Sequence, residues 1–277
     1  MANKDIGTLQ PSERLPVLFL GHGSPMTTLG DNEFRRGWQK LGMEFGTSRP
    51  RPQLILCISA HWLTQGWWLT AMQQPQTIHD FGGFPQELFD QQYPAPGSPQ
   101  LAQVLSELIR QPNGEALGLD QQDWGFDHGC WGVLKPMFPQ ADIAVIQLSM
   151  DYQQDPAVHY ALAKQLRPLR EQGVLIVASG NFVHNLRLMQ RSAPNSQAFD
   201  WTREFDQIMA QHISEGRLDA LQNFRQHGQL ADLAHPTWEH FLPLLYAAGA
   251  VESGETVQFF NDSFQAASTS MRSVVWG

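Results

Sequence analysis

Short runs of Val, Ile and Leu alternate with longer amphipathic stretches along this chain. Four of the runs are apolar throughout, which is typical of strands covered by helices on both faces of a sheet. The alternation predicts an α/β fold in which a central, mostly parallel sheet is flanked by helices on both faces. The clear strands are predicted at Val17–Gly21, Leu54–Ala60, Ile143–Leu148 and Val174–Ser179, and two weaker ones at Trp67–Met72 and Val257–Asn261.

Helical periodicity occupies most of the sequence between the predicted strands. Three of the five predicted helices begin at a proline, which is favoured in the first turn because its missing N–H costs least there. Pro168 and Pro243 fall inside two of the helices, where a kink or an early end is expected. The helices are predicted at Asn32–Leu41, Pro99–Ile109, Pro156–Glu171, Trp201–His212 and Pro236–Ala248.

The segment Gln73–Ser98 has little periodicity and contains several Gly and Pro residues. Loops of this length are commonly functional or disordered. Four aromatic residues between Phe81 and Tyr93 argue against disorder. We therefore expect an ordered flap with a short helix near Glu87.

Composition narrows the class of protein. With 277 residues, we predict a single catalytic domain over residues 1–277, with residues 1–15 as a flexible N-terminal segment. The 42% hydrophobic content argues against disorder, and the net charge of −9 argues against nucleic acid as a partner. No run of 18 apolar residues occurs, and the N-terminus is polar. We expect a cytoplasmic protein with no membrane partner, and the sequence does not determine its oligomeric state.

Three histidines follow predicted strands. His22 comes directly after VLFLG, His61 after LILCISA, and His184 three residues after VLIVASG. The carboxyl ends of strands line the ligand crevice of an open α/β sheet, so the three should converge. One histidine at a strand end is more often structural, but three at one edge favour a metal site, because neutral imidazole is a common ligand of Zn and Fe. Only two cysteines are present, so any metal must be held by His and carboxylate.

Two further histidines could join this crevice. His240 lies three residues after Thr237, a predicted N-cap, and so is expected in the first turn of a helix. Glu239 or His235 could take its place. His128 lies in the predicted loop WGFDHGCWG, whose glycines let the backbone approach a ligand closely.

The remaining histidines have simpler interpretations. His79 in HDFGGFP either supports the flap or contacts substrate. Solvated positions are expected for His159, His212 and His227, which lie in polar, helix-like stretches. Several aromatic residues adjoin the histidine motifs and could stack a flat aromatic ligand, although ordinary core packing is favoured for any single one.

An imidazole site with open positions suits Zn(II) as a Lewis acid or Fe(II) as an oxygen activator, and ligand type does not separate the two. Fe(II) can bind a chelating substrate and dioxygen together, whereas Zn(II) is redox-inert. A histidine outside the metal shell can act as acid and base, and His184 and His128 are the candidates. Neither a phosphate loop nor a GxGxxG fingerprint is present, so nucleotide chemistry is not expected.

Six ordered motifs resemble those of the class III extradiol ring-cleavage dioxygenases, and most closely the DOPA 4,5-dioxygenase group. The resemblance runs from about residue 18 to the C-terminus and implies an α/β sandwich around a metal that cleaves a catechol ring beside its two hydroxyls. The motifs are LFLGHGSPM, SAHW, HDFGGFP, GFDHGCWG, SGNFVHNL and PTWEHFLPLLYAAGA.

The resemblance implies roles for individual residues. It makes His22, His61 and His240 the metal ligands and His184 the acid and base, although some family descriptions count the last among the ligands. His128 becomes a second catalytic or substrate-contacting histidine. The flap residues expected to meet the substrate are His79, Asp80 and Phe81.

This chain departs from protocatechuate-type members, whose third ligand is a glutamate. A three-histidine site has one negative charge fewer, which favours zinc retention. We therefore expect Zn(II) in the purified protein and Fe(II) as the working ion, with a catechol and dioxygen as substrates and His184 taking a catechol proton. The alternatives are a zinc-dependent hydrolase, a tetrapyrrole chelatase-like protein and a non-catalytic metal-binding protein. Residue order does not determine which catechol is natural.

Overall fold

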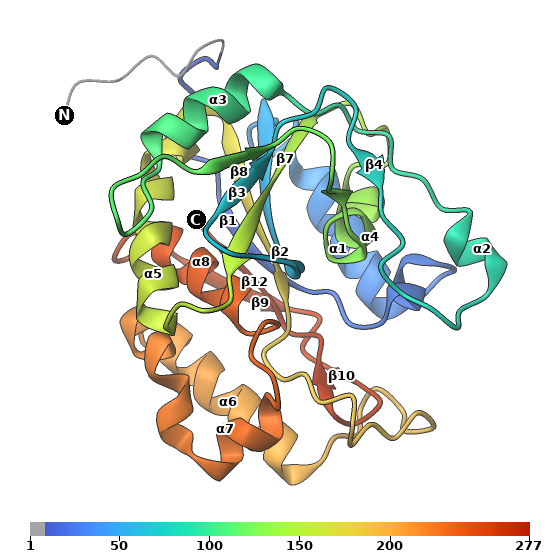
Figure 1. Cartoon of the computed structure of the whole chain (residues 1–277). Coiled ribbons are helices and arrows are strands. Elements are labelled where there is room, and N and C mark those ends of the chain that lie inside the picture. Colours follow the sequence, from blue (N-terminus) through green and yellow to red (C-terminus); the bar gives the residue numbers. More distant parts are fainter. Residues whose placement is uncertain (1–8) are drawn as a thin grey trace.

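The fold is built around a central sheet, seen edge-on among its helices in Figure 1. A computed structural model describes residues 9–277 of the chain. Within them, eight strands form the sheet in the order β5-β3-β7-β2-β8-β1-β12-β9. The strands are β1 (Val17–Gly21), β2 (Leu54–Thr64), β3 (Trp68–Thr70), β5 (Gly118–Asp120), β7 (Ala144–Asp151), β8 (Val174–Gly180), β9 (Val257–Phe260) and β12 (Ser273–Trp276).

The four central strands β7, β2, β8 and β1 run parallel to one another. Antiparallel pairing occurs toward the edges, between β1 and β12, β12 and β9, and β3 and β7. The sheet is thus mixed but mostly parallel, which confirms the predicted fold class. Two short pairs lie outside it: β4 (Gln76–Thr77) with β6 (Gly125–Phe126), and β10 (Phe264–Gln265) with β11 (Thr269–Ser270).

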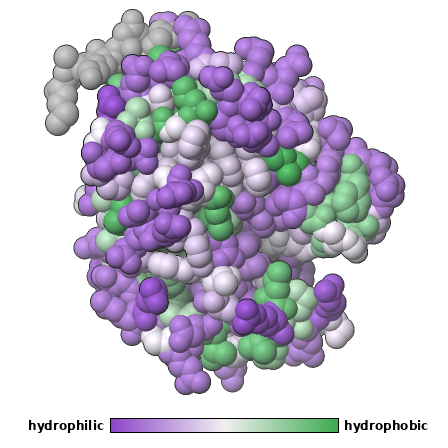
Figure 2. All heavy atoms as spheres, in the orientation of Figure 1, coloured by the Kyte–Doolittle hydropathy of each residue, from purple (hydrophilic) through white to green (hydrophobic). Residues whose placement is uncertain are grey.

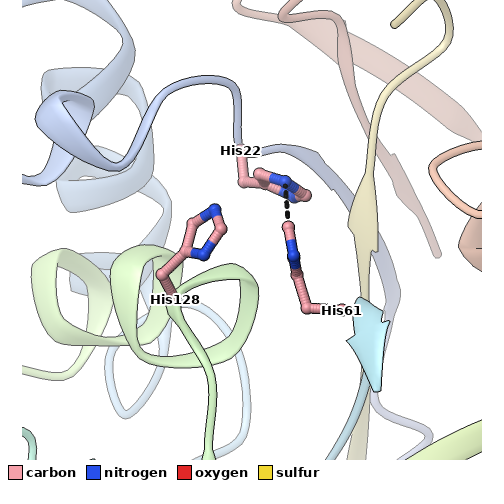
Figure 3. Close-up of side chains that lie close together, drawn as sticks. All are labelled: His22, His61 and His128. Atoms are coloured by element: carbon pink, nitrogen blue, oxygen red, sulfur yellow. Dashed lines mark hydrogen bonds between the residues drawn. The ribbon is translucent and has the colours of Figure 1, made fainter. Parts of the chain in front are cut away.

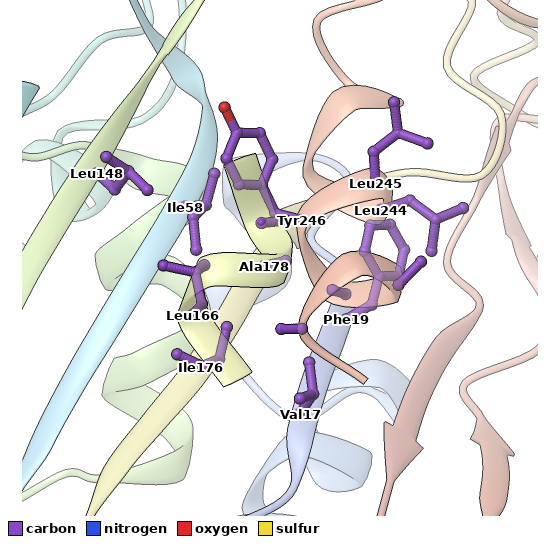
Figure 4. Close-up of a cluster of buried hydrophobic side chains, with 14 of the residues drawn as sticks. Val17, Phe19, Ile58, Leu148, Leu166, Ile176, Ala178, Leu244, Leu245 and Tyr246 are labelled. Atoms are coloured by element: carbon purple, nitrogen blue, oxygen red, sulfur yellow. The ribbon is translucent and has the colours of Figure 1, made fainter. Parts of the chain in front are cut away.

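Helices cover both faces of the sheet. On β1, Val17 and Phe19 point to one face and Leu18 and Leu20 to the other, so the strand contributes to two separate cores. Figure 4 shows the first core, which includes Phe19, Ile176 and Leu244. The helices are α1 (Glu33–Glu44), α2 (Gln86–Phe89), α3 (Pro99–Leu108), α4 (His128–Met137), α5 (Pro156–Ala163), α6 (Asp200–Ser214), α7 (Gln229–Ala234) and α8 (Leu242–Ala250), with 3₁₀ helices η1 (Pro25–Thr28), η2 (Lys164–Gln172) and η3 (Leu218–His227).

Helices α3, α5 and α8 pack in the first core, and α1 and α4 in the second. The flap contains α2 where a short helix was predicted. The helix predicted over Pro156–Glu171 instead changes to 3₁₀ geometry at Lys164, four residues before Pro168. Proline lacks the N–H that an α-helical turn requires, which accounts for the early change.

Two sequence interpretations near the site were wrong. The predicted loop around His128 is the start of α4, and the Asp127 carboxylate caps it by accepting a hydrogen bond from the Cys130 N–H. The predicted helix over Pro236–Ala248 starts only at Leu242, so Pro243 lies in its first turn, where proline is well tolerated.

The N-terminal segment predicted to be flexible divides in two. Residues 1–8 lie outside the described residues. From residue 9 onward the segment follows the body of the protein: Leu9 and Leu15 are buried, and the Ser12 N–H donates to the Glu171 carbonyl.

The face in Figure 2 is mostly hydrophilic, with small separate apolar groups. Among residues 9–277, no helix is long and apolar enough to cross a membrane.

Breaking the buried ion pair between Arg170 and Glu255 is expected to destabilise the fold. The guanidinium is 1% exposed and lies 2.5 Å from Glu255 Oε2. Replacing Arg170 by Met should lower the free energy of unfolding by about 3 kcal/mol, the low end for a buried pair, because the Glu255 carboxylate loses its ion-pair partner but is itself only partly buried. Urea unfolding at neutral pH measures this loss, and Arg51→Met, which breaks an exposed pair with Asp142, is the control.

The same pair predicts a dependence on pH. Burial acts to raise the pKa of Glu255, but the hydrogen bond from Arg170 outweighs it and the pKa lies below its usual value. Its contribution is therefore complete above the unfolded pKa of about 4.3 and is lost as pH falls through the lower folded value. The difference in urea midpoint between the native protein and Glu255→Gln should narrow below about pH 4.3, and a pH-independent difference would contradict the assignment.

Candidate metal centre

The carboxyl ends of the parallel strands bring the first histidines together. His22 directly follows β1, as predicted. His61 lies within β2, which runs four residues beyond its predicted end. Pairing of β2 with β7 is irregular between Ile58 and Leu63. Because such irregularities redirect side chains, this one accounts for the turn of His61 toward the cavity.

His22, His61 and His128 point toward one another from β1, β2 and α4 (Figure 3). The Nε2 atoms of His22 and His61 lie 3.1 Å apart. One ligand atom from each of the three histidines lies within 4.8 Å of the others. The sequence-predicted convergence of His22 and His61 is therefore present, and His128 joins it.

His240 and His184 complete the group. The His240 ring centroid lies 5.3 Å from that of His22 and 5.0 Å from that of His61. His184, which follows β8, stacks on His240 with centroids 3.5 Å apart and planes 11° apart. A second set of potential ligand atoms, all within 4.8 Å, comes from His184, Glu239 and His240.

A turn, and not the first turn of a helix, positions His240. The N–H groups of Phe241 and Leu242 both donate to the Trp238 carbonyl, which closes this turn just before α8. The Asn181 N–H donates to the His240 carbonyl at 2.8 Å, which ties the turn to the end of β8. A side chain at Gly180 would collide with that carbonyl, so glycine permits the close approach.

In four of the five histidines, Nδ1 already has a polar partner. The Nδ1 atom of His22 lies 3.1 Å from Ser179 Oγ, and that of His240 lies 3.0 Å from Glu239 Oε1. His61 and His128 both direct Nδ1 to Asp80 Oδ2, at 3.1 and 3.0 Å. This is the usual second hydrogen bond of a metal-bound histidine, which orients the ring and leaves Nε2 free as the ligand. The residues present therefore fit a divalent metal ion.

Burial keeps most of these imidazoles neutral, the form that binds metal. It lowers the pKa of His22 and His240 well below the usual value, and the neighbouring histidines add to the effect. Burial and then the neighbouring histidines lower the pKa of His184 to about 3. For His61, burial acts to lower the pKa, but the hydrogen bond to Asp80 and the charge of Asp127 outweigh it, and the pKa is raised.

Asp80 connects the flap to the histidine cluster. Its Oδ2 atom receives both Nδ1 contacts, and Oδ1 accepts a hydrogen bond from the His128 backbone N–H at 2.9 Å. Burial acts to raise the pKa of Asp80, but the hydrogen bonds from His128 and His61 lower it overall, so the carboxylate is ionised. Its negative charge adjoins the three-histidine group directly.

A second carboxylate, Asp127, is fully buried and is connected to His61 through Ser59. Ser59 Oγ donates to it at 2.6 Å and itself accepts a hydrogen bond from the His61 N–H. Asp127 also accepts side-chain hydrogen bonds from the Gln147 amide and the Trp124 indole N–H. Among residues 9–277, the hydrogen-bond donors to this carboxylate are all neutral groups. Sequence reasoning missed Asp127. Its position one residue before His128, as the N-cap of α4, was the available signal.

The cluster opens into a cavity of about 620 Å³. The flap supplies Asp80, Phe81 and Phe84 to one wall, and the segment around β10 supplies Gln265 to another. Figure 2 shows the surface hollowed between these two parts. His79 is not among the described residues that line the cavity: its Nε2 lies 2.9 Å from the Gln91 carbonyl, within the flap.

His159, interpreted from the sequence as solvated, is completely buried in the first core. Its Nδ1 lies 2.8 Å from the Tyr246 hydroxyl, which accepts a hydrogen bond from the Trp67 indole. Tyr246 lies 87 residues away in sequence. The polar, helix-like stretch around His159 therefore could not by itself predict that His159 is buried.

An α/β fold with buried histidines at the carboxyl ends of its parallel strands, opening into an aromatic-walled cavity, defines a metal-dependent enzyme that acts on a small molecule. The family described as the catalytic LigB subunit of aromatic ring-opening dioxygenase matches residues 16–276. The chain belongs to this family and is an extradiol ring-cleaving dioxygenase, an oxidoreductase.

Relatives support the family assignment. The chain is 46% identical to a protein of Escherichia coli K12 named 4,5-DOPA dioxygenase extradiol, over 99% of this chain and 98% of that protein. It is 38% identical to a protein of the same name from Portulaca grandiflora, over 84% of each. A crystal structure of an uncharacterized E. coli K12 protein aligns with a TM-score of 0.80 at 41% identity, covering 95% of this chain and all of that one.

Proposed function

We propose that this enzyme opens the ring of a catechol such as DOPA at the 4,5 bond, using dioxygen, with Fe(II) as the working ion. The observation that carries the proposal is the group of imidazoles at the base of a cavity with aromatic walls. The names of the relatives support DOPA as a substrate. A cytoplasmic location is part of the proposal, and the free thiols of Cys57 and Cys130 are consistent with it.

His22, His61 and His240 are the proposed ligands, and ring spacing supports this choice over His128. With a metal–nitrogen bond of about 2.0–2.1 Å, two imidazole centroids on one tetrahedral ion should lie about 5 Å apart. The three pairs among these residues are 5.1, 5.3 and 5.0 Å apart. The centroids of His61 and His128 are only 3.9 Å apart, too close for that arrangement.

A bound Fe(II) ion supplies two kinds of chemistry here: chelation of both catechol oxygens and transfer of electron density from the ring to dioxygen. His184 is proposed to accept a catechol proton and later return it. No ring hydrogen bond occupies it among the described residues, and it lines the cavity beside His240. His128 is the second catalytic histidine, held in place by Asp80.

The flap is proposed to hold the substrate ring. Phe81 and Phe84 line the cavity and contact each other edge to face, with centroids 5.5 Å apart. Their apolar surfaces suit the face of a catechol and exclude water around it. Asp80 belongs to the same wall. His79 stays a predicted substrate residue, and its contacts with Phe81 and Trp131 indicate that it would act through the flap.

Oxygen uptake tests the proposed function. The metal-free protein should be loaded with Fe(II) without air and then given DOPA and air. We expect consumption of one dioxygen per catechol and a yellow ring-opened product, because both oxygen atoms enter the semialdehyde and no external reductant is needed. The zinc-loaded protein is the control and should bind catechol without turnover.

Absence of oxygen uptake with DOPA and with simple catechols would contradict the dioxygenase proposal. Turnover of esters with zinc and not with iron would select the hydrolase alternative instead. Iron content should be measured in the same samples, so that a failure to load the metal is recognised.

A further inference from the structure

The lining of the cavity contains a cation that the proposed chemistry does not use. Arg191 is the only Lys or Arg among the described residues that line the cavity. It lies in the segment between β8 and α6, which also contributes Leu186 and Met189 to the lining. The histidine cluster and this arginine, whose side chain is exposed, therefore line the same cavity.

We propose that Arg191 binds an anionic substituent of the substrate, so that the enzyme selects catechols carrying a carboxylate on their side chain. This inference rests on the proposed function, because it assumes that the catechol hydroxyls occupy the histidine cluster. With the hydroxyls at that end, the ring substituent extends toward the rest of the cavity. Leu186 and Met189 then line the path of its methylene groups.

The Arg191 guanidinium is free to take this role. Among residues 9–277 it makes no hydrogen bond or ion pair, whereas Arg170 and Arg272 are each paired with a carboxylate. An arginine presents five donors in a planar fork that matches a carboxylate with two parallel hydrogen bonds.

Two other polar side chains that line the cavity are already engaged. The Asn195 amide donates to Glu33 at 2.7 Å. Gln265 donates to Thr27 and accepts a hydrogen bond from the Ser24 N–H. Arg191 is thus the available group for a charged substituent.

The net charge of the chain disfavours an anion in the cavity, and Arg191 offsets this charge locally. The chain carries a net charge of −9, and the one carboxylate among the described lining residues, Asp80, contacts the Nδ1 atoms of His61 and His128. An anionic substrate therefore needs a local cation to enter the cavity. A volume of about 620 Å³ is within the range of about 300–1,000 Å³ that holds drug-sized ligands, so it leaves room for a substituent beyond the ring.

The test compares two ligands that differ in the carboxylate: 3-(3,4-dihydroxyphenyl)propionate and 4-propylcatechol. Binding to the zinc-loaded protein is measured by calorimetry, and KM and kcat are measured with the iron-loaded protein. In Arg191→Gln, the Kd and KM of the carboxylated ligand should rise about tenfold to a hundredfold, because a charge-assisted hydrogen bond is lost. Values for 4-propylcatechol and kcat for both ligands should change little.

Arg187→Gln is the matched control, since Arg187 is exposed in the same segment but is not among the residues that line the cavity. Arg191→Lys should restore part of the affinity for the carboxylated ligand. Equal changes for the two ligands, or no change in Arg191→Gln, would overturn the inference. If the zinc-loaded protein discriminates as expected but the iron-loaded protein consumes no oxygen, the proposed function fails while the carboxylate subsite stands.

Discussion

Replacing His61 by alanine is expected to abolish stoichiometric metal binding and, with it, ring cleavage. The residue contributes Nε2 to the cluster, 3.1 Å from His22 Nε2, and its Nδ1 contacts Asp80. Loss of an outer partner of a metal ligand commonly costs 10–100-fold in affinity, so loss of the ligand itself should cost more than about a hundredfold. Titration with Zn(II) against a competing chelator measures the affinity, and His22→Ala should behave in the same way.

His227→Ala is the matched control for that experiment. His227 ends η3, and it is not among the described residues that line the cavity. Its replacement should leave metal content unchanged, and circular dichroism should show that all variants are folded. If His61→Ala still binds a full equivalent of metal tightly, His61 is not a ligand. His128 would then be the next candidate.

Replacing His184 by alanine should leave the metal in place and reduce turnover by about 10²–10⁴-fold, the usual contribution of a general acid or base. The reason is its position: it faces the cavity and stacks on His240 without hydrogen bonds to its ring nitrogens among the described residues. Catechol affinity of the zinc-loaded protein should change much less than kcat of the iron-loaded protein.

Metal content decides between two roles for His184. Loss of the metal from the alanine variant would place His184 among the ligands with His240 and Glu239, a grouping that the distances also permit. If the variant keeps its metal and its kcat is unchanged, another group transfers the proton. His128, the second proposed catalytic histidine, is then the candidate.

The strands were predictable because their side chains are apolar on both faces. The Val17–Gly21 run coincides with β1, and β8 differs from its predicted range by one residue. By contrast, α4 contains two glycines and Pro136, which give it a low helix propensity, and burial against α1 stabilises it instead. β12 is only four residues long and was missed.

The convergence of His22 and His61 could be predicted because the carboxyl ends of parallel strands meet at one edge of a sheet. That prediction needs only the order of the strands and no side-chain contacts. The contacts that hold the rings did not follow from it. The contacts of the His61 and His128 Nδ1 atoms with Asp80 depend on how the flap folds over α4. The 3.5 Å stacking of His184 on His240 depends on the turn before α8. These are distant tertiary contacts without a local sequence pattern.

The register of the central sheet also has a consequence for synthesis of the protein. β1 lies between β8 and β12, and Val17 pairs with Trp276, so the strand that presents His22 acquires its second neighbour only after residue 276 has left the ribosome. Until then the backbone edge of β1 is unpaired, which is a known route to aggregation of nascent chains. The enzyme should therefore be recovered in higher yield when chaperones are abundant.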